Sequence, residues 1–119
     1  MLIAYYSLTG NTRRFVARLV PPADRLEISA HKRATEPFVL VTPTYNFGNV
    51  PATVERFIDN NAGYMVGVIG AGNRNWGDNF AKAGRIIAQQ YDVPLLGMIE
   101  LAGTEEDVKT ITERMRELE

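Results

Sequence analysis

The chain of 119 residues contains no cysteine and only one histidine, His31. The absence of cysteine excludes disulfides, thiolate nucleophiles, iron–sulfur clusters and cysteine-based zinc sites. His31 lies in the segment Ser29-Ala30-His31-Lys32-Arg33, which we expect to be an exposed loop without a catalytic role. A histidine triad and a multi-histidine metal site are therefore not expected, and any redox chemistry must be carried by a bound organic cofactor.

The chain also lacks an excess of charge of either sign and a long hydrophobic run. Its 13 basic and 14 acidic residues give a net charge of −1, which provides no general attraction to nucleic acid or anionic membranes. No apolar segment approaches the roughly 18 residues of a bilayer-spanning helix, and the first residues read as a strand rather than a signal peptide. We expect a cytoplasmic protein that binds neither nucleic acid nor membrane.

Five short apolar segments alternate with segments of helical periodicity. With 45% hydrophobic and 23% charged residues, this length predicts a single globular domain over residues 1–119. The continuous apolar character of runs such as Phe38-Val39-Leu40-Val41 is typical of strands buried on both faces of a parallel sheet. The predicted strands are Leu2–Tyr6, Arg25–Ile28, Phe38–Thr42, Met65–Ala71 and Leu95–Leu101.

Helical spacing of apolar residues appears in four segments between and after these strands. The second segment follows Pro51, which suits the first helical position, and the last begins at Thr104-x-x-Asp107, which resembles a capping box. The apolar stripes are Phe15 and Leu19; Val54, Phe57 and Ile58; Phe80, Ala83, Ile87 and Tyr91; and Val108, Ile111, Met115 and Leu118.

This order of elements predicts an α/β fold. Right-handed crossovers give a three-layer, doubly wound sandwich around a five-stranded parallel sheet, for which the usual strand order is 2-1-3-4-5. Ligands of such sheets bind where the winding direction reverses, between strands 1 and 3.

The segment Ser7-Leu8-Thr9-Gly10-Asn11-Thr12 joins the first strand to the first helix. A helix N-terminus carries unsatisfied N–H donors and a partial positive charge, so it binds anions. Hydroxyl side chains add hydrogen-bond donors, and Gly10 permits close approach of the backbone. The loop lacks the lysine of a Walker-type triphosphate site, which favours a single terminal phosphate. The alternative is an ordinary helix cap.

Two further loops should reach the same carboxyl edge of the sheet. The segments 42–51 and 70–78 contain Tyr45, Phe47 and Trp76 among glycine and asparagine residues. Aromatic faces can stack on a flat heteroaromatic ring, and closely approaching backbone amides can bind its edge. These aromatic residues could instead serve loop packing, and Trp76 could anchor the following helix.

The first loop resembles the phosphate loop of flavodoxins, which bind flavin mononucleotide (FMN), and Thr42-Pro43-Thr44-Tyr45 resembles their second flavin loop. The segments 46–51 and 72–78 are similar to those of the NrdI family, small flavodoxin-like FMN proteins of class Ib ribonucleotide reductase. The resemblance covers essentially the whole chain, although Asn46 stands where much of the family has glycine. It implies FMN contacts from Ser7, Leu8, Thr9, Gly10, Asn11, Thr12, Thr44, Tyr45, Asn46, Phe47, Gly48, Asn73, Trp76 and Gly77.

The same resemblance implies a function. Reduced FMN would react with O2, and the superoxide or peroxide formed would oxidise the dimanganese centre of the reductase's small subunit, which then forms its tyrosyl radical. The chain would be an accessory redox protein without catalytic side chains or a metal site, reduced by a flavodoxin reductase or another electron donor. Arg74 and Asp78 are the only charges of the three loops, so no ring of carboxylates disfavours an anionic reduced flavin.

Two alternatives predict different chemistry. A generic short-chain flavodoxin, acting as a one-electron carrier, shares the fold and the cofactor. A CheY-like receiver domain would require paired acidic residues after the first strand and an aspartate after the third, where this chain has Tyr6-Ser7 and Thr42-Pro43.

Overall fold

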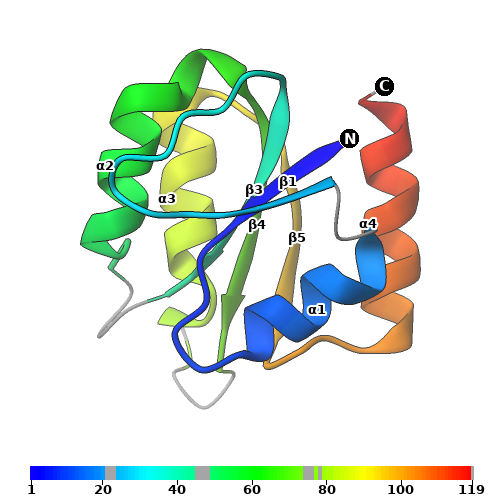
Figure 1. Ribbon diagram of the computed structural model, residues 1–119. Helices are drawn as coiled ribbons and strands as arrows, with labels where there is room; N and C mark the ends of the chain where they lie inside the picture. Colours follow the sequence, from blue (N-terminus) through cyan, green and yellow to red (C-terminus); the bar gives the residue numbers. More distant parts are fainter. Residues whose placement is uncertain (21–23, 45–48, 74–76, 78, 119) are drawn as a thin grey trace.

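The computed structural model describes residues 1–20, 24–44, 49–73, 77 and 79–118 (Figure 1). Its five strands form one parallel sheet in the order β2-β1-β3-β4-β5, so the predicted doubly wound α/β fold is confirmed. The strands are β1 (Leu2–Tyr5), β2 (Arg25–Glu27), β3 (Phe38–Pro43), β4 (Met65–Gly72) and β5 (Leu95–Glu100). The helices are α1 (Asn11–Leu19), α2 (Ala52–Asn61), the 3-10 helix η2 (Ala62–Tyr64), α3 (Lys82–Tyr91) and α4 (Glu105–Glu117).

The helices cover both faces of the sheet, with α1 and α4 on one face and α2 and α3 on the other (Figure 1). Strand β3 shows how the sequence builds both layers, because alternate side chains of a strand point to opposite faces. Val39 and Val41 belong to the apolar core on the α1/α4 side, whereas Phe38 and Leu40 belong to the core on the α2/α3 side. A run of apolar residues without alternation therefore supplies two cores at once.

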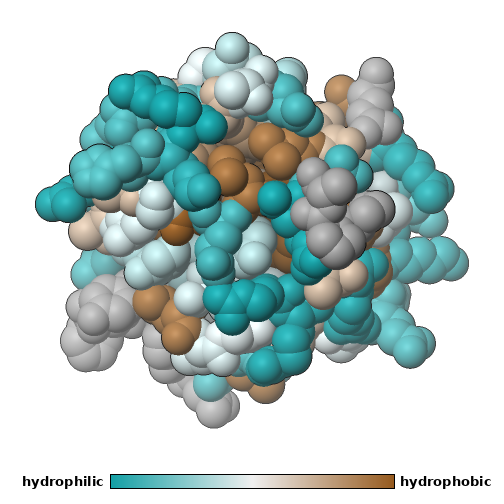
Figure 2. Space-filling view, viewed as in Figure 1, coloured by the Kyte–Doolittle hydropathy of each residue, from teal (hydrophilic) through white to brown (hydrophobic). Residues whose placement is uncertain are grey.

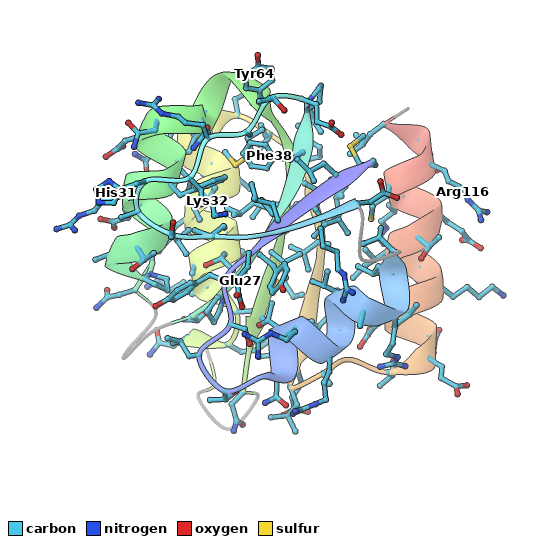
Figure 3. The ribbon with its side chains drawn as sticks, viewed as in Figure 1. Glu27, His31, Lys32, Phe38, Tyr64 and Arg116 are labelled. Carbon is cyan, nitrogen blue, oxygen red and sulfur yellow. The ribbon has the colours of Figure 1, made fainter. Side chains whose placement is uncertain are left out.

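The connection between β2 and β3 contains no helix and runs beside α2 (Figure 1). Asn61, which is 4% exposed, links this connection to α2 through side-chain hydrogen bonds. Its Oδ1 accepts a hydrogen bond from the N–H of Ala34 at 2.8 Å, and its Nδ2 donates to the carbonyls of Lys32 and Phe57 at 3.0 and 2.8 Å. His31 lies on this loop, exposed at the surface as predicted (Figure 3).

A loop covers less of a sheet than a helix does, and part of this face stays accessible. Leu2, Tyr6 and Leu26 pack against the α2/α3 core but are only partly buried. Figure 2, in which the two helix layers lie to the left and right as in Figure 1, shows hydrophobic surface in the upper middle of the molecule, bordered by hydrophilic residues.

The predicted strands shift by one residue at several ends, and two helix starts differ from the prediction. Pro51 precedes α2 instead of opening it, and Phe80 precedes α3. The second difference has a local cause, because Ala81 adopts a left-handed conformation (φ 51°, ψ 23°) that ends the helical pattern before Lys82. The capping box of α4 is confirmed, since Thr104 and Asp107 each accept a hydrogen bond from the other's backbone N–H. No helix in the described part of the chain could span a membrane.

Candidate functional site

A cavity of about 430 Å³ opens at the carboxyl edge of the sheet. It lies beside the ends of β1 and β3, where the winding of the sheet reverses, which is the usual ligand position in this class of fold. Segments that follow four strands contribute to it. The lining residues are Leu8, Thr9, Asn11, Thr12, Pro43, Thr44, Ala71, Gly72, Asn73 and Leu101.

The loop after β1 places the start of α1 at this cavity. Gly10 precedes the helix with φ 88°, a conformation that other residues adopt only with strain. The N–H groups of Asn11 and Thr12 belong to the first turn, so they have no acceptor within the helix. Both residues line the cavity, and Thr12 is only 4% exposed. This end of the cavity is therefore suited to an anion.

Ser7 supports the loop from within. Its Oγ accepts hydrogen bonds from the N–H groups of Gly10 at 3.0 Å and Arg13 at 3.4 Å. Ser7 does not line the cavity but belongs to a neighbouring hollow beside β2. Ser7 therefore acts as a cap for the loop and the start of α1, as the alternative interpretation of this segment expects. The other residues of the loop that border the cavity are Leu8, Thr9, Asn11 and Thr12.

Thr44 connects the loop after β3 to the start of α3. It is almost fully buried, and its Oγ1 accepts a hydrogen bond from the N–H of Ala83 at 3.3 Å. Its own N–H donates to the carbonyl of Ala71 at 2.9 Å. Thr44 thus lines the cavity and also holds two of the elements that form it.

Two glycines of β4 allow α3 to approach this edge of the sheet. A Cβ atom on Gly70 would lie 2.6 Å from the carbonyl oxygen of Ala81, and one on Gly72 would lie 2.7 Å from the Ala81 nitrogen. Any side chain at these positions would displace the helix start. Gly72 consequently lies close to Ala81, directly before α3, and it borders the cavity together with Ala71 and Asn73.

Exposed leucines mark the rim. Leu8 is 49% exposed and Leu101 is 52% exposed, and both line the cavity. Leu101 also has φ 54°, which is strained for a leucine, and its N–H donates to the carbonyl of Gly72 at 3.1 Å. The sequence prediction missed Leu101 as a site residue because it was placed at the end of a buried strand.

The electrostatics of the site come from residues around the cavity, since none of the described lining side chains is ionisable. Arg13 of α1 pairs with Glu27 at the end of β2. The hydrogen bond with Glu27 raises the pKa of the Arg13 guanidinium. Arg14 donates instead to the Oδ1 of Asn11 beside the loop. In the described ranges, no cluster of three or more acidic or histidine side chains could hold a metal ion.

The remaining predicted contacts fall in three groups. Asn73, one of the predicted contacts, lines the cavity. Gly77 (φ 58°) is exposed and does not line it. Tyr45, Asn46, Phe47, Gly48 and Trp76 lie outside the described residues, as do the charged residues Arg74 and Asp78.

Comparisons with known proteins identify the family. A family profile described as "NrdI Flavodoxin like" matches residues 3–113. The chain is 46% identical over 113 residues to Protein NrdI of Bacillus licheniformis, covering 95% of this chain and 86% of that protein. Among solved structures, the oxidised Flavodoxin 2 of Bacillus cereus superposes with a TM-score of 0.72 at 25% identity, covering 98% of this chain and 95% of that one.

A Fusobacterium nucleatum flavodoxin, solved bound to flavin mononucleotide, has the same fold. It gives a TM-score of 0.67 at 21% identity, with 98% of this chain and 94% of that one covered. The profile match and the sequence identity together show that this chain belongs to the NrdI flavodoxin-like family.

Proposed function

We propose that this chain is a single-domain FMN flavoprotein, over residues 1–119, that serves a class Ib ribonucleotide reductase. Bound and reduced FMN would supply the electrons that convert O2 into superoxide or peroxide, the oxidant for assembling the dimanganese–tyrosyl radical cofactor of the reductase's small subunit. The observation that carries the proposal is a cavity with a helix N-terminus at one end and no charged side chain in its described lining, in a chain of the NrdI family.

The residues at the α1 end fit a phosphate group. The first-turn N–H groups of Asn11 and Thr12 point along the helix axis toward its N-terminus and lack helical acceptors. The hydroxyls of Thr9 and Thr12 and the amide of Asn11 add further donors. Because Ser7 already stabilises the loop, the donors are held in place before a ligand arrives.

The other end fits a flat aromatic ring system. Leu8 and Leu101 expose apolar surface on the rim, and Pro43 and Ala71 add more inside. The backbone of Gly72 and Asn73 borders the same part of the cavity. Covering the two leucines would remove from water an apolar surface that the chain otherwise leaves exposed. Tyr45, Asn46, Phe47, Gly48, Trp76 and Gly77 remain proposed contacts.

The absence of ionisable lining side chains, among those described, bears on the reduction of the flavin. A nearby carboxylate would oppose a negative charge on the reduced ring, most strongly where water is excluded. The described lining imposes no such repulsion and offers no general acid, base or nucleophile. The chain would therefore act by binding and tuning its cofactor, as an accessory protein and not as an enzyme with its own turnover substrate.

A generic short-chain flavodoxin function is the alternative, and the similarity of fold to flavodoxins supports it. The two functions share the cofactor and an external electron donor but differ in the acceptor. The lack of charge in the described part of the lining favours a donor to O2 over a carrier that is restricted to single-electron steps.

The test is to mix the FMN-loaded, reduced protein with a Mn(II)-loaded class Ib small subunit and O2, and to measure the tyrosyl radical by electron paramagnetic resonance. We expect radical formation well above that supported by a generic flavodoxin at equal concentration. Equal yields from the two proteins would contradict the assembly function and leave FMN binding standing.

A further inference from the structure

Helix α1 begins with an arrangement of charge that disfavours the helix itself. Its first turn contains no acidic residue, and two arginines, Arg13 and Arg14, are the third and fourth residues of the helix. Cations at a helix N-terminus oppose the macrodipole, which favours acidic side chains there. A local arrangement that reduces stability in this way is characteristic of functional sites.

The two arginines have different partners. Arg13 is paired with Glu27 on β2, so its charge is balanced within the fold. Arg14 donates from Nη2 to Oδ1 of Asn11, three residues before it, and forms no ion pair with a described residue. Its guanidinium also lies against Gly10, since a Cβ atom there would be 3.2 Å from Nη1 of Arg14. Among the described residues, Arg14 thus has no acidic partner, and it places a positive charge beside the loop.

The contact with Asn11 also fixes the orientation of an amide. A guanidinium group only donates hydrogen bonds, so it must face the oxygen of the asparagine side chain. The amide NH2 of Asn11 is then the group left available to a ligand, and Asn11 lines the cavity. The opposite orientation would present a carbonyl oxygen to an anion, which repels it.

We propose that Arg14 is a positioning residue for the terminal phosphate of the cofactor, acting through the side chain of Asn11. The inference rests on the proposed FMN function and deepens it. Arg14 keeps the Asn11 amide turned with its donor toward the phosphate, and its charge adds to the anion affinity of the helix terminus. The specific consequence is discrimination between FMN and riboflavin, which lacks the phosphate.

The experiment compares FMN and riboflavin binding to the full apo chain by quenching of flavin fluorescence. Arg14→Gln should weaken FMN binding about tenfold, the effect of losing a charge-assisted hydrogen bond, while riboflavin binding changes by less than about twofold. Arg13→Gln, which removes the same charge one residue away, is the matched control and should change the FMN affinity much less. Arg14→Lys keeps the charge and should recover part of the loss.

A double-mutant cycle tests the route through Asn11. In an Asn11→Ala background, Arg14→Gln should have less than about half of its effect on FMN affinity, because the amide that it orients is gone. Equal effects in both backgrounds would overturn the positioning role. Equal losses for FMN and riboflavin, or an unchanged affinity ratio in Arg14→Gln, would also overturn it. Failure of the unmodified chain to bind FMN would instead overturn the proposed function.

Discussion

A Cβ atom added to Gly84 of α3 would lie 2.7 Å from the Cα atom of Gly70 in β4. The helix therefore rests on the strand backbone to backbone, without a side chain between them. This contact sets the depth at which α3 begins, and Thr44 then reaches the first turn of α3 from the neighbouring loop. The position of the cavity edge depends on two residues that do not line it.

Gly84→Ala should destabilise the protein by about 3 kcal/mol, because the interior at this point cannot take an added methyl group without moving the helix. Urea unfolding followed by circular dichroism would measure the loss. The control is Gly63→Ala in η2, an exposed site where an added Cβ would meet no atom within 4 Å. That variant should be neutral or more stable by about 0.5 kcal/mol, and a comparable loss in both variants would contradict the packing argument.

Asn61→Ala should lower the free energy of unfolding by about 2 kcal/mol, since the buried N–H of Ala34 and the Lys32 carbonyl would lose their partner. The neighbouring Asn60 is exposed, and its side chain makes only a 3.5 Å contact with the Ala30 carbonyl. Asn60→Ala should therefore change stability by less than about 0.5 kcal/mol. Thermal and urea unfolding of the pair would show whether the loop between β2 and β3 depends on this single side chain.

Leu101→Asn should have opposite effects on stability and binding. Asparagine tolerates φ 54° better than leucine, so we expect the apo protein to gain about 1 kcal/mol. The loss of apolar surface at the rim should weaken FMN binding about fivefold. Leu8→Asn is the control, because Leu8 shares the exposure and the cavity but not the positive φ. Leu8→Asn should weaken FMN binding without stabilising the fold. A gain in stability in both variants would show that the backbone strain at Leu101 is not the cause of the stabilisation.

Tyr91 should make the free energy of unfolding depend on pH in the alkaline range. Partial burial, with smaller contributions from the charges of Asp59 and Glu55, raises the pKa of the Tyr91 hydroxyl above its ordinary value. The unfolded chain releases this proton first, so the contribution is complete below the ordinary tyrosine pKa and is lost as the pH rises through the folded value.

Spectrophotometric titration of tyrosinate in the folded protein would check this. Tyr91→Phe should remove the tyrosine with the raised pKa, and Asp59→Asn should move the pKa of Tyr91 toward its ordinary value. Tyr64→Phe, at an exposed site, serves as the control. A titration curve that Asp59→Asn leaves unchanged would show that this carboxylate does not act on Tyr91.

The sequence predicted the sheet and the edge that carries the site because both depend on strong local signals. Runs such as residues 38–42 can only be buried on both faces, and the loop 7–12 has the composition of an anion site. The prediction failed at Phe80, where an apolar residue extended a helical pattern. Ala81 is a strong helix former, yet it adopts a left-handed conformation at the point where it packs closely against Gly70 and Gly72.

Side-chain direction was the other part that sequence could not supply. A serine hydroxyl can cap a loop or face a ligand, and only the structure shows that Ser7 receives the N–H of Gly10. In the same way, the sequence indicates only that Arg14 is a solvent-exposed helix residue, and the structure adds the hydrogen bond from its guanidinium to Asn11. The apolar rim at Leu101 was hidden by its place next to a strand.

The spread of the cavity lining along the chain, from Leu8 to Leu101, has a consequence for biosynthesis. Strand β1 is made first, but β3, which pairs with it, begins 36 residues later, at Phe38, and Thr44 needs Ala83 for its hydrogen bond. Most of the chain must therefore have been synthesised before all the segments that line the cavity are present. The full set of lining residues, which ends at Leu101, is available to a flavin only after β5 has been translated.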